Sequence, residues 1–148
     1  MTEQFRLRKA SAEDSVFFYN VKKIVLKKYI EEIWGWDEAF QLKFHEENFD
    51  MDKTFIIEVN QQPAGTVEIK EDTERIFICS LYILPEYQNR KIGTGVCERF
   101  MKIAETQKKR ICLEVLKINV NAQKLYAKLG FILSGGDETK YFMFKDYL

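Results

Sequence analysis

The first half of the chain alternates between the periodicity typical of strands and that of helices. Residues 5–8 alternate apolar and basic side chains, which predicts a short half-buried strand. Residues 11–14 have the spacing of a capping box, and the apolar side chains after them recur at helical intervals, so we expect a helix over 12–31. Asp37 is placed to cap a second helix that ends near Glu47.

Strand patterns fill the middle of the chain. Residues 54–59 and 66–70 predict a hairpin joined by the polar, glycine-containing turn 60–65, and a long apolar strand is expected over 75–84. These three strands predict an antiparallel meander. A strand at 111–116 follows a helix, and a strand-helix-strand crossover makes it parallel to the 75–84 strand.

Two further helices and a hairpin complete the pattern. Asn119 or Asn121 is placed to cap the last helix, which Gly130 ends, and a closing hairpin pairs 131–133 with 141–147. The elements predict an α/β (α+β) fold with a mixed, mostly antiparallel sheet of about seven strands flanked by about four helices. The helix before the 111–116 strand is amphipathic, with an apolar face formed by Val96, Phe100, Ile103 and Ala104.

Length and charge narrow the class of protein. The chain has 148 residues and no repeat, low-complexity tract or linker, so one domain over 1–148 is expected. Basic and acidic residues are equal at 23 each, which disfavours nucleic acid or an anionic membrane as a partner. The charged N-terminus is unlike a secretory signal, and the longest apolar segment is too short to span a bilayer. We therefore expect a soluble, cytoplasmic protein.

Cysteine and histidine usage points away from metal and redox chemistry. Cys79, Cys97 and Cys112 are widely spaced in apolar surroundings, so reduced, buried thiols are expected, with no metal site. The single histidine, His45, falls on the second predicted helix and is expected at the surface. Because no activating base accompanies Cys79, a covalent acyl-cysteine route is disfavoured.

The most informative stretch runs from Leu81 to Gly95, where an apolar strand stops at Pro85 and a polar, basic loop opens a helix. The free N–H groups and the positive dipole end of a helix make an anion site, and glycine lets a phosphate approach the backbone. Arg90 and Lys91 add positive charge beside it. Alternatively, the glycines only allow a tight strand-to-helix connection, because short glycine motifs have many false positives.

Two motifs in this order resemble the GCN5-related N-acetyltransferase (GNAT) family. The sequence PEYQNRKIGTG at 85–95 is similar to the family's acetyl-CoA pyrophosphate loop, usually written (Q/R)-x-x-G-x-(G/A). The segments LEV at 113–115, NVNAQKLY at 119–126 and LGF at 129–131 are similar to the family's strand-helix-strand segment that ends LYxxxGF. Their joint occurrence is more specific than either motif alone, and it covers the last half of the chain.

The loop departs from the family pattern at one position. With Gln88 in the leading position, Lys91 falls where the family has its first glycine. A register that starts at Arg90 restores both glycines, Gly93 and Gly95, but breaks the proline spacing. We prefer the Gln88 register, because the apolar periodicity defines where the helix begins, and Lys91 is then expected to add a phosphate contact.

The resemblance implies acetyl-CoA as co-substrate and no metal. It also implies that the 75–84 and 111–116 strands splay apart at their C-terminal ends, so that the pantetheine arm pairs with the backbone like an added strand. Asn119 is expected to contact the cofactor arm, to cap its helix, or both. The residues implied in cofactor binding are Tyr82, Ile83, Leu84, Gln88, Asn89, Arg90, Lys91, Ile92, Gly93, Thr94, Gly95 and Asn119.

Direct acetyl transfer to an amine needs a base and an acid. Glu114 alternates with Cys112 and Leu116, which predicts a carboxylate on an otherwise apolar strand face, where desolvation would raise its pKa. Alternatively, Glu114 is a strand-end carboxylate paired with a Lys or Arg, and Glu68 is the reserve base. The resemblance implies Tyr126 as the general acid, off the buried stripe of its helix; alternatively, its ring only packs at the core margin.

The expected acceptor is a primary amine of a small molecule or peptide. In the family, the first two helices and their connection border the acceptor site, so the resemblance implies Tyr29, Trp34 and Trp36 as substrate-binding residues. Aromatic faces suit a cationic amine. Alternatively, the tryptophans anchor the loop to the core. Whether the chain forms a homodimer is left open.

Two other classes of function use the same loop. One is a non-catalytic acyl-CoA-binding or regulatory module of the same fold. The other is a nucleotide-binding α/β protein, which is disfavoured because the glycines lack the spacing of a P-loop or a dinucleotide fingerprint and the preceding strands form an antiparallel meander.

Overall fold

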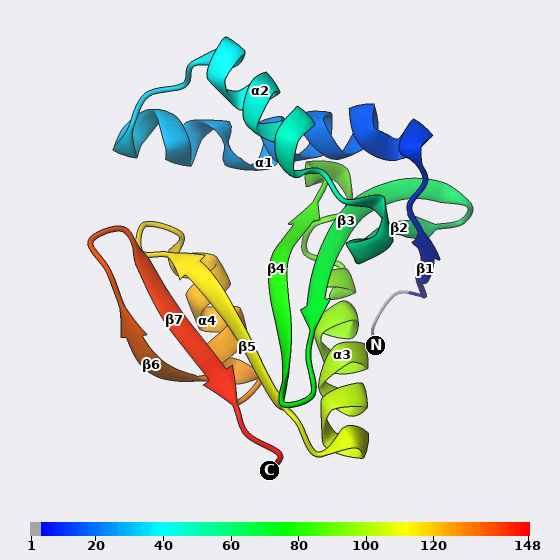
Figure 1. The fold of residues 1–148 in the computed structure, drawn as a ribbon, viewed down its shortest axis with the longest axis vertical. Coiled ribbons are helices and arrows are strands. Elements are labelled where there is room, and N and C mark those ends of the chain that lie inside the picture. The colour runs from blue at the N-terminus through cyan, green and yellow to red at the C-terminus, as the bar shows by residue number, and fades with distance from the viewer. Residues whose placement is uncertain (1–3) are drawn as a thin grey trace.

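The computed structural model describes residues 4–148, which form one mixed sheet with helices packed on it (Figure 1). In these residues the sheet has seven strands in the order β1-β2-β3-β4-β5-β7-β6, and four α-helices flank it, as predicted. The strands are β1 (Arg6–Lys9), β2 (Thr54–Val59), β3 (Gln62–Glu71), β4 (Arg75–Ile83), β5 (Arg110–Leu116), β6 (Ile132–Gly136) and β7 (Lys140–Lys145). The helices are α1 (Ser15–Ile33), α2 (Glu38–Asn48), α3 (Ile92–Gln107) and α4 (Val120–Lys128).

The first two helices start at the capping residues that the sequence indicates. The backbone N–H of Ser11 donates to Asp14 Oδ2 at 2.8 Å, and a 3₁₀ turn over Ala12–Asp14 leads into α1. The α-helix therefore begins at Ser15, slightly later than predicted. Asp37 accepts a hydrogen bond from the backbone N–H of Phe40 at 3.1 Å and caps α2 as expected.

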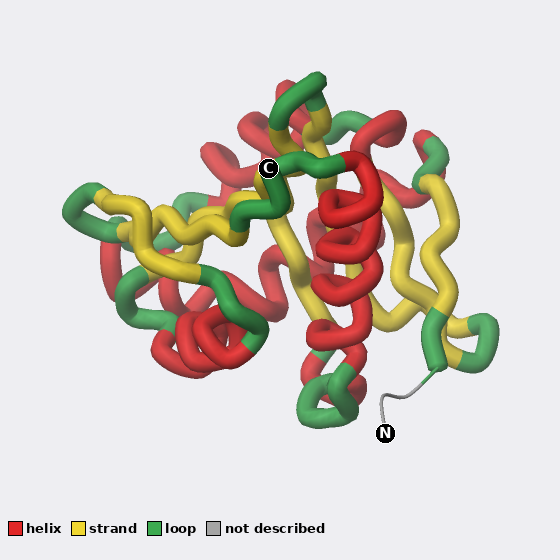
Figure 2. Tube along the Cα trace, turned by 90° about the horizontal axis from the view of Figure 1, so that it is seen from below, coloured by secondary structure: helices red, strands yellow, loops and turns green. Residues whose placement is uncertain are grey.

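Helices lie on both sides of the sheet. α3 and α4 lie behind it in Figure 1, whereas α1 and α2 cross the end at which β4 finishes. Seen from below, α3 runs along the middle strands (Figure 2). Ile103, expected on the apolar face of α3, is 36% exposed at the margin of that face. The residues that α3 buries in the core are Ile92, Val96, Cys97, Phe100, Met101 and Ala104.

The predicted meander is present, with two local features that the sequence did not indicate. β2, β3 and β4 pair antiparallel, and a bulge leaves Cys79 without a partner, because Glu68 pairs with Ser80 while Ile69 pairs with Ile78. At Gly65, a Cβ atom would lie 2.2 Å from the backbone oxygen of Tyr82. A glycine is therefore required for β3 to approach the end of β4.

The parallel strands β4 and β5 diverge, as the resemblance implied. They pair from Arg75 and Arg110 as far as Ile78 and Leu113, and then both continue without pairing with each other. β5 stays paired with β7 on its other side as far as Leu116. The sheet therefore opens between the C-terminal ends of β4 and β5 (Figure 1).

Candidate active site

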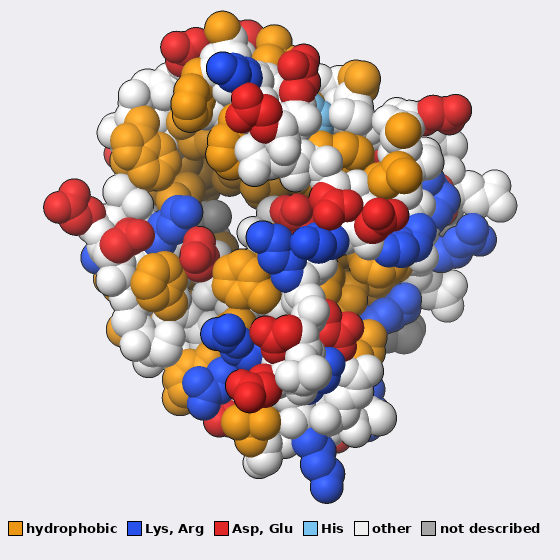
Figure 3. All heavy atoms as spheres, viewed as in Figure 1, with side chains coloured by type: hydrophobic (Ala, Val, Ile, Leu, Met, Phe, Trp, Pro, Cys, Tyr) orange, Lys and Arg blue, Asp and Glu red, His pale blue; other side chains and the backbone are white. Residues whose placement is uncertain are grey.

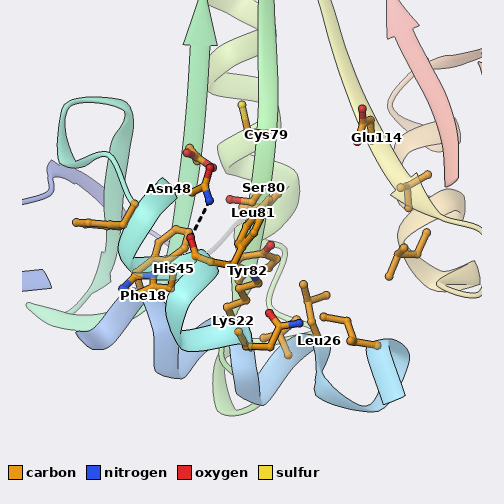
Figure 4. Close-up of a pocket in the computed structure, with 18 of the residues that line it drawn as sticks. Phe18, Lys22, Leu26, His45, Asn48, Cys79, Ser80, Leu81, Tyr82 and Glu114 are labelled. Carbon is orange, nitrogen blue, oxygen red and sulfur yellow. Dashed lines mark hydrogen bonds between the residues drawn. The ribbon is translucent and has the colours of Figure 1, made fainter. Parts of the chain in front are cut away.

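A cavity of about 890 Å³ lies where β4 and β5 diverge. Its walls come from α1 and α2, from β3 and β4, and from β5 and α4. Figure 3 shows this face of the molecule hollowed between an apolar group of side chains and a charged surface below it. Figure 4 shows Cys79, Ser80, Leu81 and Tyr82 on β4, with Glu114 on β5 across the opening.

Tyr126 forms part of the cavity wall from α4. Asn119 Oδ1 accepts a hydrogen bond from the backbone N–H of Ala122 at 3.2 Å, so the predicted cap of α4 is confirmed. The expectation that Tyr126 lies off the buried stripe is wrong, because its side chain is 9% exposed and packs edge-on against Phe131. Burial raises the pKa of Tyr126, so its hydroxyl keeps its proton at neutral pH.

Glu114 has the environment of the alternative interpretation. It lines the cavity, but its side chain is 41% exposed and its Oε2 lies 3.4 Å from Lys140 Nζ. The expected desolvation of Glu114 is therefore wrong. The reason is that Val115 and Leu113 point into the core, so Glu114 lies on the opposite face of β5, beside the strand that carries Lys140.

Glu68, the reserve base, has the environment that was expected of Glu114. It is half-buried on β3, faces the cavity and pairs in register with Ser80 at the bulge of β4. Burial raises the pKa of Glu68, and the charge of Lys70 partly opposes this shift. A carboxyl group with a raised pKa is a stronger proton acceptor than an exposed one once it is ionised.

The loop after β4 contains two residues with left-handed backbone conformation. Asn89 and Lys91 have φ angles of 63° and 62°, in the left-handed region that favours glycine. Lys91 is the residue that stands where the family pattern has its first glycine. Gln88 Nε2 donates to the backbone oxygen of Ile83 at 2.9 Å, which ties the loop to the end of β4.

The N-terminus of α3 presents unpaired donors. The first helical hydrogen bond at the cap joins the N–H of Gly95 to the oxygen of Lys91 at 3.0 Å, so the N–H groups of residues 92–94 have no acceptor within the helix. The side chain of Lys91, the N-cap residue, forms no capping hydrogen bond with these N–H groups. A Cβ at Gly93 would approach nothing closer than Leu125 Cδ2, at 3.9 Å, so packing inside the protein does not require this glycine.

Beyond Ile78, the edge of β4 that faces β5 pairs with no strand of the described chain, and the backbone oxygen of Ile83 accepts the hydrogen bond from Gln88 Nε2. The N–H of Leu84 donates to the oxygen of Ala64 at 2.9 Å, and the oxygen of Tyr82 faces Gly65 of β3. Because successive peptide groups of a strand point to opposite sides, the N–H of Ile83 points toward the opening. An extended ligand can therefore pair along this edge as an added strand does.

The α1–α2 wall contains one of the three predicted acceptor residues. Trp34 is 60% exposed and lines the cavity, whereas Tyr29 and Trp36 are not among its lining residues. Lys22, Phe40 and Phe44 line the same wall and were not predicted. Helical periodicity places these residues on α1 and α2 but does not indicate which of them face the cavity. That depends on the angle at which α2 packs on α1.

His45 is buried, so its expected position at the surface is wrong. Its side chain is 7% exposed, its Nε2 lies 2.8 Å from Ser15 Oγ, and its ring stacks on Phe18 at 5.8 Å between centroids. Burial, and then the nearby charge of Lys22, lower the pKa of His45. The residue belongs to the packing between α1 and α2.

The three cysteines form no disulfide, but the expected burial is confirmed only for Cys97. Cys97 is buried, and Cys79 and Cys112 are half-buried. Burial raises the pKa of Cys79 to about 11, so it is a poor nucleophile at neutral pH. Among the described residues, no cluster of three or more His, Cys, Asp or Glu side chains is arranged to hold a metal ion. None of the helices within residues 4–148 combines the length and hydrophobicity needed to cross a membrane.

Comparisons with known proteins agree with this architecture. The chain is 28% identical over 81 residues to the probable N-acetyltransferase camello of Xenopus laevis, a match that covers 52% of this chain and 37% of that protein. Its fold is similar to that of the PaiA N-acetyltransferase of Thermoplasma acidophilum, solved in complex with coenzyme A (TM-score 0.78, 22% identity, 97% of this chain and 99% of that chain).

A second solved structure with this fold is Naa50 of Arabidopsis thaliana in complex with the bisubstrate analogue CoA-Ac-MVNAL (TM-score 0.72, 15% identity, 96% of this chain and 98% of that chain). The sequence model of the Acetyltransferase (GNAT) family matches residues 18–131. Because this match covers most of the chain, the protein belongs to the acetyltransferase (GNAT) family.

Proposed function

We propose that the protein transfers an acetyl group from acetyl-CoA directly to a primary amine of a small molecule or peptide, within a ternary complex. The observation that carries this proposal is the opening of the sheet, where β4 and β5 pair only as far as Ile78 and Leu113 and a cavity fills the space beyond. The loop at residues 88–95 follows the open end of β4, so one ligand can contact both.

The loop and the strand edge suit different parts of acetyl-CoA. The unpaired N–H groups at the start of α3, the helix dipole and the charge of Lys91 favour a pyrophosphate. The open edge of β4 suits the amide-containing pantetheine arm. The N–H of Ile83 on that edge is our candidate to polarise the acetyl carbonyl.

Glu68 is the proposed base and Tyr126 the proposed acid. The amine nitrogen attacks the thioester carbon, a C–N bond forms and the C–S bond breaks. Glu68 accepts the proton that the amine loses, and Tyr126 donates a proton to the departing thiolate, so that CoA leaves as a thiol. The raised pKa of Glu68 and its half-buried position support its choice over Glu114, which is exposed and paired with Lys140.

The test is steady-state release of CoA against a broad panel of primary amines. We expect Tyr126→Phe and Glu68→Gln to lower kcat by about a hundredfold, the usual contribution of one acid or base. Glu114→Gln is the matched control, and we expect its rate to stay within about twofold of the wild type, because an exposed ion pair contributes little.

Two results would contradict the proposal. If acetyl-CoA binds in calorimetry but no amine causes release of thiol, the protein is a non-catalytic acyl-CoA-binding module. If Glu114→Gln abolishes the rate while Glu68→Gln does not, transfer occurs but the base is Glu114.

A further inference from the structure

The α1–α2 wall of the cavity carries a lysine and two aromatic rings that the proposed chemistry does not use. Lys22 of α1 is half-buried, and its Nζ lies 4.8 Å from the centroid of the Phe44 ring. Phe44 stacks on Phe40, with 6.3 Å between the ring centroids. These three side chains all line the cavity and form one continuous cluster, which we call the Lys22 cluster.

Of the four lysines that line the cavity, two have carboxylate partners, whereas the half-buried Lys22 and the exposed Lys70 form no ion pair among the described residues. Lys53 pairs with Asp50 at 3.8 Å, and Lys140 pairs with Glu114 at 3.4 Å. Lys22 forms no ion pair within the part of the chain that the structure describes. Burial lowers the pKa of Lys22, and the more distant charge of Glu68 opposes this shift. A half-buried cation without a bound anion is costly, so an anion supplied by a ligand would stabilise it.

The rings beside Lys22 are unusually exposed for their size. Phe40 is 60% exposed and Phe44 is 46% exposed, and both border the cavity. Exposed apolar side chains that line a cavity mark a place where a ligand buries apolar surface. The Lys22 cluster therefore offers an anion-binding group directly beside an apolar surface.

Glu68, the proposed base, faces the same cavity and lies close enough to Lys22 for their charges to interact. An acceptor that reaches both side chains must present an amine near a carboxylate, with an apolar group next to them. In an α-amino acid with a large apolar side chain, the amine, the carboxylate and the apolar group are attached to one carbon atom.

We propose that the acceptor is an amine that carries a carboxylate beside an apolar group, as in a free apolar α-amino acid. Lys22 binds the carboxylate, and Phe40 and Phe44 pack on the apolar side chain. This inference rests on the proposed acetyl transfer and specifies the substrate of the same site.

The test compares matched acceptors in the CoA-release assay. L-Phenylalanine has all three groups, phenylalaninamide and phenethylamine lack the carboxylate, and L-alanine lacks the large apolar group. We expect kcat/KM for L-phenylalanine to exceed that for either carboxylate-free amine by about tenfold or more, the usual effect of one hydrogen bond to a charged group. L-Alanine should also be a poorer acceptor than L-phenylalanine.

Variants then show whether Lys22 causes this preference. Lys22→Met should raise KM for L-phenylalanine about tenfold and lower kcat/KM for phenethylamine far less, whereas Lys22→Arg should keep most of the preference. Lys28→Met is the matched control, because Lys28 is an exposed lysine of the same helix whose Nζ lies 5.0 Å from the Tyr29 ring. Lys28→Met should change kcat/KM for neither L-phenylalanine nor phenethylamine.

The outcomes separate this inference from the proposed function. CoA release that does not depend on the acceptor carboxylate, or that favours phenylalaninamide as a peptide-like amine, overturns the inference and leaves acetyl transfer standing. If Lys22→Met slows both acceptors equally and shifts the pH profile, Lys22 only tunes Glu68 and the inference is wrong. If no amine in the panel causes release of CoA, the proposed acetyl transfer is wrong, and the inference about its acceptor is wrong with it.

Discussion

Lys91, the N-cap residue of α3, has a φ angle of 62°, a conformation that glycine adopts freely and that costs another residue about 1 kcal/mol or more. The family pattern has a glycine at this position. The lysine therefore keeps the loop conformation at a cost in stability, and it places a positive charge at the N-terminus of α3. A contact between the Lys91 charge and a phosphate would explain why a strained lysine stands at this position.

Lys91→Gly should separate the backbone strain at this position from the role of its charge. We expect its free energy of unfolding to rise by about 1 kcal/mol, because the left-handed strain is removed. At the same time, KM for acetyl-CoA should rise by about threefold, because one exposed charge near the phosphates is lost. Urea denaturation and steady-state kinetics measure the two effects.

Lys108→Gly is the matched control. Lys108 has a φ angle of 56° at the other end of α3, far along the helix from the loop. It should be stabilised in the same way with no change in KM. If Lys91→Gly leaves KM for acetyl-CoA unaltered, Lys91 has no part in phosphate binding.

Among the elements, β4 decides the shape of the site. Gly65 lets β3 approach the end of β4, the bulge at Cys79 shifts the register, and the edge that faces β5 is left unpaired beyond Ile78. The shape of the cavity thus depends on how β3, β4 and β5 are held together.

Gly65 and Gly93 differ in what an added Cβ atom would contact, so their alanine variants should differ in stability. Gly65→Ala should lower the free energy of unfolding by about 2 kcal/mol or more, because its Cβ would lie 2.2 Å from the backbone oxygen of Tyr82 and the strands must separate. Gly93→Ala should unfold at the same or a slightly higher urea concentration, because its Cβ meets only Leu125 at 3.9 Å.

Gly93→Ala, which should leave stability intact, is expected to affect binding of acetyl-CoA. Gly93→Ala should bind acetyl-CoA more weakly in calorimetry, since a methyl group would stand where a phosphate approaches the N–H groups. A Gly93→Ala protein with wild-type affinity would mean that the glycine serves only the strand-to-helix connection.

At the scale of the whole molecule, the cavity exists because α1 and α2 close the end of the sheet that β4 and β5 open. Glu68 is half-buried only in this assembly, and its raised pKa is a property of the folded protein. Its protonated form is favoured in the folded state. Its contribution to stability is therefore present at a pH below its unfolded pKa and is lost as the pH rises through its folded pKa.

The raised pKa of Glu68 predicts how the rate of acetyl transfer depends on pH. We expect kcat/KM to rise with pH through the raised pKa of Glu68, and Glu68→Gln to remove this acidic limb. At neutral pH, Glu68→Gln should unfold at a higher urea concentration than the wild type, because no buried carboxylate remains. Loss of activity together with a gain in stability would show that Glu68→Gln removes a catalytic group and does not misfold the protein. Glu114→Gln, which alters an exposed carboxylate, should change neither the pH profile nor the urea midpoint.

The elements, their order and the parallel strand pair were predictable from the amino-acid sequence. Local hydrogen bonding at Ser11, Asp37 and Asn119 and the alternation of apolar residues are properties of neighbouring positions, so they can be read without knowing the fold.

Which side chains face the cavity depends on how the elements pack and could not be predicted from periodicity. Tyr126 proved buried, Glu114 exposed and paired, and His45 packed between two helices, because each depends on the angle at which one element lies on another. The same packing brings Lys22 and Glu68, distant in the sequence, to one cavity. Periodicity specifies a face of an element, whereas burial and pKa depend on what covers that face.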